Sequence, residues 1–283
     1  MHSRELGLVL AQQILGVEDL HYGLWDGDLE LKLGNLAAAQ QRYTDMLAGA
    51  LPPPQPGPVR VLDIGCGTGH MLGQLLDRGY RVDGVVPSPG LARVVRERLA
   101  KRPASETRVF ECKFEDFPAA EMAGRYDVAL FSESFQYIPM DASLTIAHAL
   151  LKPGGVMVLC DFFKTEHHGD GGPGDRSLGG GHRLTDFYAR IRSTPFKPLR
   201  DEDITRRVSP NLELINDFLL NTVKPVGAAL DQYLRSNFPG LSWIARKLLA
   251  RKIEKANYKY FSGHRNKGTF ERYKSYHLMV FAK

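Results

Sequence analysis

The sequence predicts an α/β fold in which a mostly parallel sheet is covered by helices on both faces. Short apolar runs alternate with segments of helical period from about residue 59 to residue 163, which is typical of parallel strands connected by helices. A glycine-rich turn at residues 65–69 follows the first apolar run and precedes the first helical segment. Ligands of such sheets bind beyond the carboxyl ends of the strands, so the loops that follow strands are the candidate sites.

The individual elements follow from local patterns in chain order. Residues 1–50 are rich in helix formers and end at a proline-rich stretch, 52–58, which predicts helices and then a linker. Strands are expected at 59–64, 80–86, 107–112, 126–132, 154–163, 196–205 and 273–283, and helices at 70–79, 90–102, 141–151 and 185–193. Asp141 is the expected N-cap of its helix, and residues 209–263 are expected to form a helical insertion.

Composition places the chain among soluble globular proteins. It has 283 residues, of which 43% are hydrophobic and 24% are charged. No run of 18 apolar residues occurs, so no membrane span is predicted. The N-terminal residues do not resemble a secretion signal, and Cys66, Cys112 and Cys160 form no metal-binding or disulfide pattern. We therefore expect a cytoplasmic protein with reduced thiols.

Positive charge is concentrated near the C-terminus. The net charge is +5, yet residues 241–283 contain eleven Lys/Arg and only two Asp/Glu. Such a segment favours an anionic partner, which could be a phosphate-bearing substrate, a membrane surface or nucleic acid. The alternative is a solvated basic face without a partner.

The first strand and its turn resemble one known family. Residues 61–69, VLDIGCGTG, are similar to the first motif of the class I S-adenosylmethionine-dependent methyltransferases. The segment RYDVALFSESFQYI resembles the fourth-strand motif of that family, LLKPGGVMVL its fifth-strand motif, and YHLMVFAK fits its antiparallel closing strand. The likeness is close over residues 60–163 and looser elsewhere. It specifies a fold and a cofactor but no substrate.

The resemblance implies a Rossmann-like class I methyltransferase fold with a seven-stranded, mostly parallel sheet, an antiparallel last strand and a helical cap. It implies S-adenosylmethionine as cofactor, with the methionine end over the glycine turn and its amino and carboxylate groups near Asp63 and the end of the fourth strand. The expected cofactor-binding residues are Asp63, Gly65, Cys66, Gly67, Gly69, Val86, Pro87, Ser88, Phe114, Glu115, Ser132, Gln40 and Trp25.

The end of the second strand departs from the family pattern. The family usually has an acidic residue there, which binds both ribose hydroxyls, but this sequence has Val86. Asp83 is a poor substitute, because the two-residue period of a strand points it to the opposite face. Loss of a charge-assisted hydrogen bond costs about 1.5–3 kcal/mol. We favour a working site with a more apolar ribose pocket over a degenerate relative.

The N-terminal segment also resembles a subgroup of the family. Ala39 and Gln40 are similar to a helix of cyclopropane-fatty-acid synthases and related C-methyltransferases, and LHYGLWD resembles the lid segment of those enzymes. That resemblance implies that Tyr22, Trp25 and Gln40 close over the cofactor. Simple packing in the core or at the surface is the alternative for each of the three.

Three residues are expected to carry the chemistry. Methyl transfer needs alignment, exclusion of water and often a base. Glu133 and Tyr137 follow the fourth strand, and His182 lies in the glycine-rich loop after the fifth. His182 is the preferred base, because histidine titrates near pH 7 and the adjacent glycines would let it reach the pocket; a surface loop histidine is the alternative. His167 and His168 match no usual ligand spacing, so no metal is expected.

These observations lead to one functional hypothesis. We expect O- or C-methylation of a hydrophobic or lipid-like small molecule, which the basic segment would allow to be anionic. The run SESFQY is not the motif of enzymes that methylate base nitrogens, so no nucleic acid is expected. The amphipathic, basic stretch 241–267 is either packed on the sheet or a peripheral membrane contact. The alternatives are non-methyl chemistry with the same cofactor, or a degenerate binding scaffold.

The expected organisation has four parts. They are an N-terminal helical lid at 1–50, a cofactor-binding core at 58–208, a helical insertion at 209–263 and a final strand within 264–283.

Overall fold

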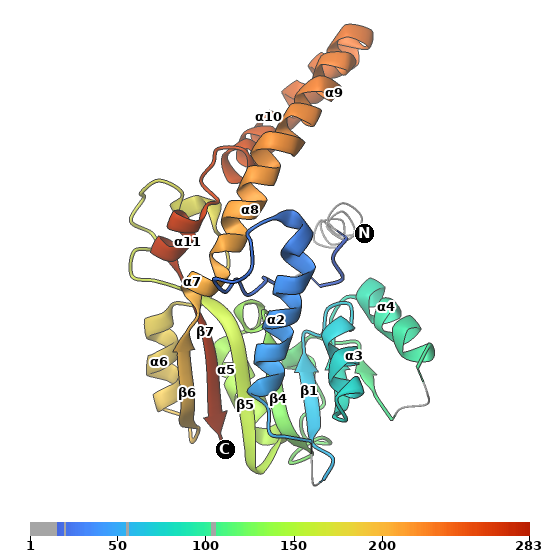
Figure 1. The fold of residues 1–283 in the computed structure, drawn as a ribbon, viewed down its shortest axis with the longest axis vertical. Helices are drawn as coiled ribbons and strands as arrows, with labels where there is room; N and C mark the ends of the chain where they lie inside the picture. The colour runs from blue at the N-terminus through green and yellow to red at the C-terminus, as the bar shows by residue number, and fades with distance from the viewer. Residues whose placement is uncertain (1–15, 20, 55–56, 103–105) are drawn as a thin grey trace.

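The computed structural model describes residues 16–19, 21–54, 57–102 and 106–283 (Figure 1). Its centre is one seven-stranded sheet in the order β3-β2-β1-β4-β5-β7-β6. The strands are β1 (Arg60–Ile64), β2 (Arg81–Val85), β3 (Val109–Phe110), β4 (Tyr126–Ser132), β5 (Leu151–Lys164), β6 (Lys197–Asp203) and β7 (Lys274–Ala282). Strands β1 to β5 pair in parallel, and β7 runs antiparallel to both β5 and β6. The predicted fold class is confirmed.

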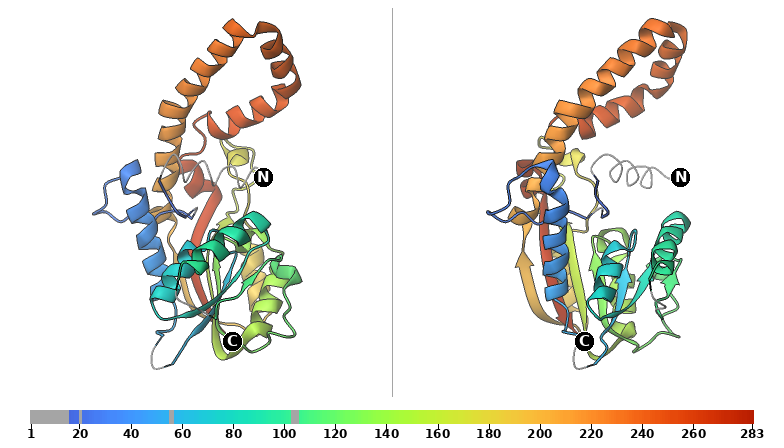
Figure 2. Two further views of the ribbon diagram at one scale, coloured as in Figure 1. Left: turned by 90° about the vertical axis from the view of Figure 1, so that its right-hand side faces the viewer. Right: turned by 45° about the vertical axis from the view of Figure 1, so that its right-hand side comes forward.

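Helices cover both faces of this sheet (Figures 1 and 2). One face carries α2 (Leu36–Gly49), α3 (His70–Asp77) and α4 (Pro89–Ala100), and the other carries α5 (Met140–Leu150) and α6 (Leu184–Arg192). The remaining helical elements are η1 (Leu33–Asn35), η2 (Phe114–Asp116), η3 (Phe135–Tyr137), η4 (Asp175–Ser177), α7 (Thr205–Val208), α8 (Pro210–Phe218), η5 (Leu219–Val223), α9 (Lys224–Asn237), α10 (Pro239–Tyr260) and α11 (Lys267–Tyr273).

The core is double because strand side chains alternate between the two faces. In β4, Val128 and Leu130 join the cluster under α2 and α3, whereas Ala129 and Phe131 join the cluster under α5 and α6. All four side chains are fully buried. Central strands that are apolar at every position are what a sheet covered on both faces requires.

The N-terminal segment differs from the helical segment that the composition predicts. Among the described residues before the linker, helix is confined to 33–49, and the segment 21–31, here called the strap, has no helix or strand. The strap runs so close to α2 that a Cβ atom on Gly23 would lie 2.5 Å from the Cβ of Ala39. Tertiary contact, and not helix propensity, therefore sets its shape. The predicted helix content of residues 1–15 lies outside the described residues.

The predicted cap of α5 is also corrected. The N-cap position is Pro139, whose carbonyl accepts hydrogen bonds from the main chain and side chain of Ser143. Asp141 lies inside the first turn and forms an ion pair with Arg190 of α6 at 2.7 Å. The negative charge of Asp141 still stabilises the N-terminus of α5. Its ion pair with Arg190 also links α5 to α6.

The insertion forms a long helical hairpin. Helices α8, η5 and α9 run on continuously, and α10 returns toward the body, so that α9 and α10 project beyond the rest of the molecule (Figures 1 and 2). The pictures place this hairpin at the end of the molecule toward which β1 points. None of the helices in the described parts of the chain is long and apolar enough to cross a bilayer.

Candidate functional site

The glycine turn joins the carboxyl ends of three strands. Gly65, Gly67 and Gly69 have φ values of +85°, +54° and +75°, which side chains rarely adopt. A side chain on Gly65 would meet the side chain of Ser134 after β4, whereas one on Gly67 would meet nothing within 4 Å. The main-chain N–H groups of Gly65 and Cys66 both donate to the carbonyl of Val85. The turn is thus packed on one side and open at its middle glycine.

Asp63 lies in β1 just before this turn and carries an unpaired carboxyl oxygen. Its side chain is buried, and its Oδ2 has no hydrogen-bond partner among the described residues. Burial, and secondarily the charge of Asp19, raises its pKa to about 7. A buried carboxyl without a partner is costly, and the cost is removed when a cation binds beside it.

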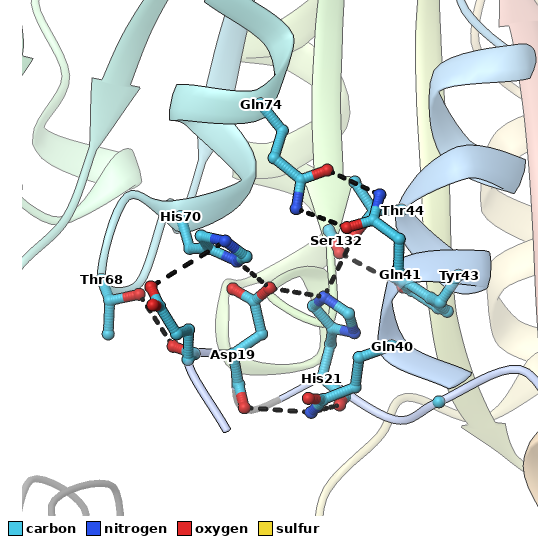
Figure 3. Close-up of polar contacts among 12 residues, drawn as sticks. Asp19, His21, Gln40, Gln41, Tyr43, Thr44, Thr68, His70, Gln74 and Ser132 are labelled. Carbon is cyan, nitrogen blue, oxygen red and sulfur yellow. Dashed lines mark hydrogen bonds and ion pairs between the residues drawn. The ribbon is translucent and has the colours of Figure 1, made fainter. Parts of the chain in front are cut away.

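The residues just before the strap contact the glycine turn and α3 (Figure 3). Asp19 accepts hydrogen bonds from His70 at 2.6 Å, and it pairs with His21 at 3.3 Å. Thr68 in the turn donates to the carbonyl of Glu18 at 3.2 Å. Burial acts to raise the pKa of Asp19, but the two histidines outweigh it and hold the pKa below its usual range.

Gln40 fixes the same residues from the side of α2. Its Nε2 donates to the carbonyls of Asp19 and His21, at 3.0 and 2.8 Å (Figure 3). The side chain is buried. Gln40 therefore positions the main chain on either side of residue 20, and the lid role that the resemblance implies for it stays a prediction.

Glu133 follows β4 and has an unusual backbone. It is the non-glycine residue of the described chain with a positive φ, +51°, a conformation that costs free energy and occurs often at functional sites. Its Oε1 accepts hydrogen bonds from the N–H of Tyr22 in the strap at 2.7 Å and from the hydroxyl of Tyr276 at 2.8 Å. Burial raises the pKa of Glu133, although His21 and these two hydrogen bonds act in the opposite direction.

A polar network extends from Glu133 into the core. The Tyr276 hydroxyl lies 3.0 Å from that of Tyr43 of α2, which lies 3.2 Å from the hydroxyl of Ser132. Asp161 of β5 accepts hydrogen bonds from the main chain and side chain of Gln136, and burial raises its pKa to about 8. Two carboxyls with raised pKa values therefore lie at the ends of neighbouring strands, as is common at functional sites.

Aromatic rings form an apolar wall beside Glu133. Tyr22, Phe162, Phe270 and Tyr276 contact one another edge-to-face or tilted, with centroids 5.8–6.4 Å apart. They come from the strap, β5, α11 and β7. Phe162, Phe270 and Tyr276 are buried, and Tyr22 is the ring of the four that is partly exposed.

The ribose end of the expected cofactor site is apolar and closely packed. Val86 is 2% exposed and belongs to the cluster of Cys66, Met71 and Val95. Asp83 faces away, as expected, and accepts hydrogen bonds from Arg108 and Tyr126. No carboxylate of β2 therefore takes the place of the acidic residue that the family usually has at the position of Val86.

The other expected adenosine contacts lie at neighbouring strand ends. The Ser88 hydroxyl caps α4 and accepts a hydrogen bond from the N–H of Leu91, at 3.3 Å, and Pro87 precedes it. Phe114 is buried in the opposite core cluster, whereas Glu115 next to it is exposed.

Trp25 lies in a small cluster of its own. Its side chain packs with Val17, Leu36 and Leu214, between the strap, α2 and α8, and its main-chain N–H donates to the carbonyl of Arg207. Its contacts anchor the strap, and the pocket-facing role remains a prediction.

The expected catalytic residues are brought together only in part. The His182 ring nitrogen Nε2 lies 3.1 and 3.0 Å from the carbonyls of Phe135 and Ile138, so it carries a hydrogen and donates to them. His182 thereby fixes the turn that follows Glu133 and has only Nδ1 available as an acceptor. Tyr137 lies in η3 and is 60% exposed. His168 pairs with Asp175 at 3.3 Å, and the described residues contain no group of three or more His, Cys, Asp or Glu placed to hold a metal ion.

Sequence reasoning missed Asp19, His70, Tyr43 and Tyr276. Asp19 and His70 are 51 positions apart, and Tyr43 and Tyr276 are 233 apart. Their sequence neighbourhoods gave one signal only, the position of His70 directly after the glycine turn.

Two cavities, of about 230 Å³ beside Arg60 and Tyr80 and about 510 Å³ beside Arg272 and Ser275, lie away from the glycine turn.

Part of the sequence matches one protein family and several known methyltransferases. Residues 61–155 match the family described as a methyltransferase domain. A sterol 4-C-methyltransferase of Caenorhabditis elegans is 32% identical over 39% of this chain and 33% of that protein. A ubiquinone biosynthesis O-methyltransferase of Pseudomonas aeruginosa is 30% identical over 52% of this chain and 61% of that protein. The chain thus matches less than two thirds of the length of either relative.

Solved structures share the fold over nearly the whole chain. A cyclopropane synthase from Mycobacterium tuberculosis has a TM-score of 0.66 at 18% identity and covers 94% of this chain and 90% of that one. A geranyl diphosphate C-methyltransferase from Streptomyces coelicolor, in complex with geranyl diphosphate and S-adenosylhomocysteine, has a TM-score of 0.65 at 17% identity, covering 96% and 92%. The predicted resemblance is confirmed at the level of the fold.

Proposed function

We propose that this chain, which carries a methyltransferase domain within the class I S-adenosylmethionine-dependent fold, methylates a hydrophobic or lipid-like small molecule. One observation carries the proposal: Glu133, a partly buried carboxyl on a left-handed backbone, directly precedes Ser134, whose side chain lies against Gly65 of the glycine turn. S-adenosylmethionine supplies the activated methyl group when it is bound. The residues of the chain hold the cofactor, exclude water and accept a proton.

The residues around the glycine turn fit the methionine end of that cofactor. The unpaired Oδ2 of Asp63 suits an ammonium group, and the open space at Gly67 lets a ligand approach the main chain. Asp19 and Gln40 hold the covering segment in place. The adenosine would lie against the apolar end of β2, where binding rests on burial more than on charge.

Glu133 is the base that the geometry favours. Its raised pKa makes the carboxylate a stronger proton acceptor than an exposed glutamate, and its neighbours fix its orientation. It would accept the proton that the acceptor atom loses on methylation. His182 then acts as a positioning residue, because its Nε2–H holds the turn after Glu133. Tyr137 remains a candidate at the mouth of the site.

A hydrophobic acceptor with an anionic group fits the surroundings of Glu133. The partly exposed ring of Tyr22, which packs on the buried rings of Phe270 and Tyr276, offers apolar surface. Arg265 lies close enough to Tyr22 to lower the pKa of that hydroxyl against the dominant effect of burial, which raises it. The buried Nε of Arg265 has no hydrogen-bond partner among the described residues. A phosphate or carboxylate on the acceptor would supply that partner. The basic segment 241–267 would bring such an enzyme to a membrane surface.

The test is transfer of labelled methyl from S-adenosylmethionine to a panel of isoprenoid diphosphates, quinone precursors, sterols and fatty acyl lipids. Glu133→Gln should lower kcat by about 10²–10⁴-fold on the substrate found, with cofactor affinity nearly unchanged. The acid limb of the wild-type profile should reflect protonation of Glu133. Asp127→Asn is the matched control, because Asp127 is a paired carboxylate at the opposite end of the same strand.

Two further variants separate the roles of His182 and Arg265. His182→Ala should lower kcat modestly and leave the pH profile in place; loss of the acid limb would make His182 the base instead. Arg265→Gln should raise the KM of an anionic acceptor, and exposed Arg125→Gln should not.

Calorimetric titration with S-adenosylmethionine and S-adenosylhomocysteine distinguishes an enzyme from a binding scaffold. Binding of neither at millimolar concentration would refute the proposal. Binding of both without transfer to any acceptor in the panel would favour non-methyl chemistry on the same fold.

A further inference from the structure

The hairpin of α9 and α10 has no core of its own. Neither helix contains a buried residue, although both are rich in large apolar side chains. Between residues 226 and 253 the exposed large apolar residues are Val226, Leu230, Tyr233, Leu234, Phe238, Leu241, Trp243, Ile244, Leu248, Leu249 and Ile253. Isolated exposed apolar residues are ordinary, but eleven on one projecting element mark an interaction surface.

The largest exposed residues gather at the tip of the hairpin. Phe238 lies between the two helices, and Leu241 and Trp243 lie in the first turn of α10, where they are 70% and 64% exposed. Lys247 lies over the Trp243 ring at 5.1 Å. Tryptophan with a cation beside it is typical of side chains at a membrane–water boundary, where one end is apolar and the other wet.

Basic residues follow Leu241 and Trp243 along α10. The first are Arg246 and Lys247, about 7–9 Å along the helix axis from Leu241 at a rise of 1.5 Å per residue. The others are Arg251, Lys252, Lys255 and Lys259, against one acid, Glu254. An apolar tip that penetrates about 5–10 Å would place the first basic pair at the level of the lipid headgroups.

The net charge of the hairpin indicates which kind of partner binds its exposed apolar surface. Residues 224–260 contain eight Lys/Arg and two Asp/Glu, whereas the whole chain has a net charge of only +5. A second copy of the hairpin would bring like charges together, which opposes pairing. We propose that the tip of the hairpin, residues 233–249, inserts into the headgroup region of an anionic lipid surface.

The base of the hairpin is joined to the strap. Asn211 in α8 accepts a hydrogen bond from the N–H of Gly23 at 2.9 Å and donates to its carbonyl at 2.6 Å. Helix α8 continues through η5 into α9, and the hairpin rises from the end of the molecule that carries the glycine turn (Figure 1). A docked hairpin would therefore turn the end of the molecule that carries the covered site toward the lipid surface. This inference rests on the proposed function for its lipid-like acceptor.

Binding to vesicles tests the inference without measuring turnover. The full chain is sedimented with vesicles of phosphatidylcholine containing phosphatidylglycerol, and with phosphatidylcholine alone. We expect binding to the anionic vesicles that falls as salt rises, and weak binding to the neutral ones. Trp243 should shift its fluorescence to the blue and be quenched by lipids labelled in the upper acyl chain. Trp243→Phe, which keeps buried Trp25, should bind but lose that response.

Paired variants locate the contact. Leu241→Glu with Ile244→Glu should reduce vesicle binding at least tenfold, and Arg246→Gln with Lys247→Gln about tenfold. Leu199→Glu, at an equally exposed apolar position on β6, and Lys101→Gln with Arg125→Gln should bind like the wild type.

Three results would overturn the inference. The first is no binding to anionic vesicles, and the second is an equal loss of vesicle binding in the control variants. The third is a stable dimer in light scattering that dissociates in the tip variants. Cofactor affinity, measured by calorimetry on the same samples, separates this failure from failure of the proposed function. The tip variants should retain it.

Discussion

At the scale of single residues, Asp63 shows how a binding site is kept ready at a cost in stability. Its carboxyl is buried, lacks a partner on one oxygen and stays protonated up to a pKa of about 7. The unfolded chain ionises near the ordinary value of 3.8. Between these two pH values the folded state therefore binds more protons, and the free energy of unfolding falls as pH rises from about 4 to about 7.

The substitution Asp63→Asn should therefore have opposite effects on stability and binding. It should raise the free energy of unfolding of the cofactor-free protein at pH 8 by roughly 1–3 kcal/mol, since the penalty for ionisation disappears. At pH 4 the gain should be small. Affinity for S-adenosylmethionine should fall at pH 8, because the ammonium loses its counter-charge. Thermal unfolding at both pH values and calorimetry measure the two effects. A destabilised variant at pH 8 would contradict this account.

Val86 is the counterpart of Asp63 at the other end of the site. An apolar side chain that is 2% exposed replaces the carboxylate that the family usually carries. The nearest carboxylate on that strand, that of Asp83, already accepts hydrogen bonds from Arg108 and Tyr126. Main-chain groups and burial therefore have to provide the recognition of the ribose. The sequence alone indicates this difference from the family, because it depends on the identity of one residue.

At the scale of elements, the strap and α2 form the cover of the site. At Gly23 the strap lies directly against Ala39 of α2, and Asn211 binds both main-chain groups of Gly23. From there the strap reaches Glu133 through the N–H of Tyr22. Displacement of the strap should therefore disturb the carboxylate and the cofactor cover together.

Gly23→Ala tests that coupling. The new Cβ atom would lie 2.5 Å from that of Ala39, so the strap must shift, at a cost of about 1–3 kcal/mol. We expect lower thermal stability, cofactor affinity about tenfold weaker and faster proteolysis of residues 21–31. Gly27→Ala is the control, because nothing lies within 4 Å of a Cβ atom there. Similar behaviour of the two variants would contradict the coupling.

At the scale of the whole molecule, the hairpin is an addition to a self-sufficient body. The double core is built by the sheet and the helices that flank it, and no residue of α9 or α10 is buried. The two ends of the hairpin lie together, since the side chain of Lys224 donates to the carbonyl of Phe261 at 3.3 Å.

Replacement of residues 225–260 by a short Gly-Ser linker should therefore leave the body folded. We expect a thermal midpoint within a few degrees of the full chain and unchanged affinity for S-adenosylhomocysteine, because no core contact is lost. Vesicle binding should disappear. Differential scanning calorimetry and titration provide the measurements. Loss of cooperative unfolding would show that the hairpin supports the core.

The sequence predicted most of the sheet and part of the site. The strand at residues 126–132 is found with the same bounds, and the glycine turn lies where expected, because both are local patterns. The strap, the contacts of His182 and the cap of α5 were not predictable. Each depends on a contact with a distant segment, such as that of His182 with the carbonyls of Phe135 and Ile138.

By itself, the sequence determined the layered α/β fold, the glycine turn and the absence of a carboxylate at Val86, since periodicity and residue identity act over a few neighbouring positions. Only the tertiary structure decided which polar groups meet. It placed Glu18 and Asp19 against the turn and α3, left one carboxyl oxygen of Asp63 without a partner among the described residues, and set Glu133 between Tyr22 and Tyr276. Those properties arise from burial and long-range contact, which change the pKa and the role of a side chain without leaving a mark in the local sequence.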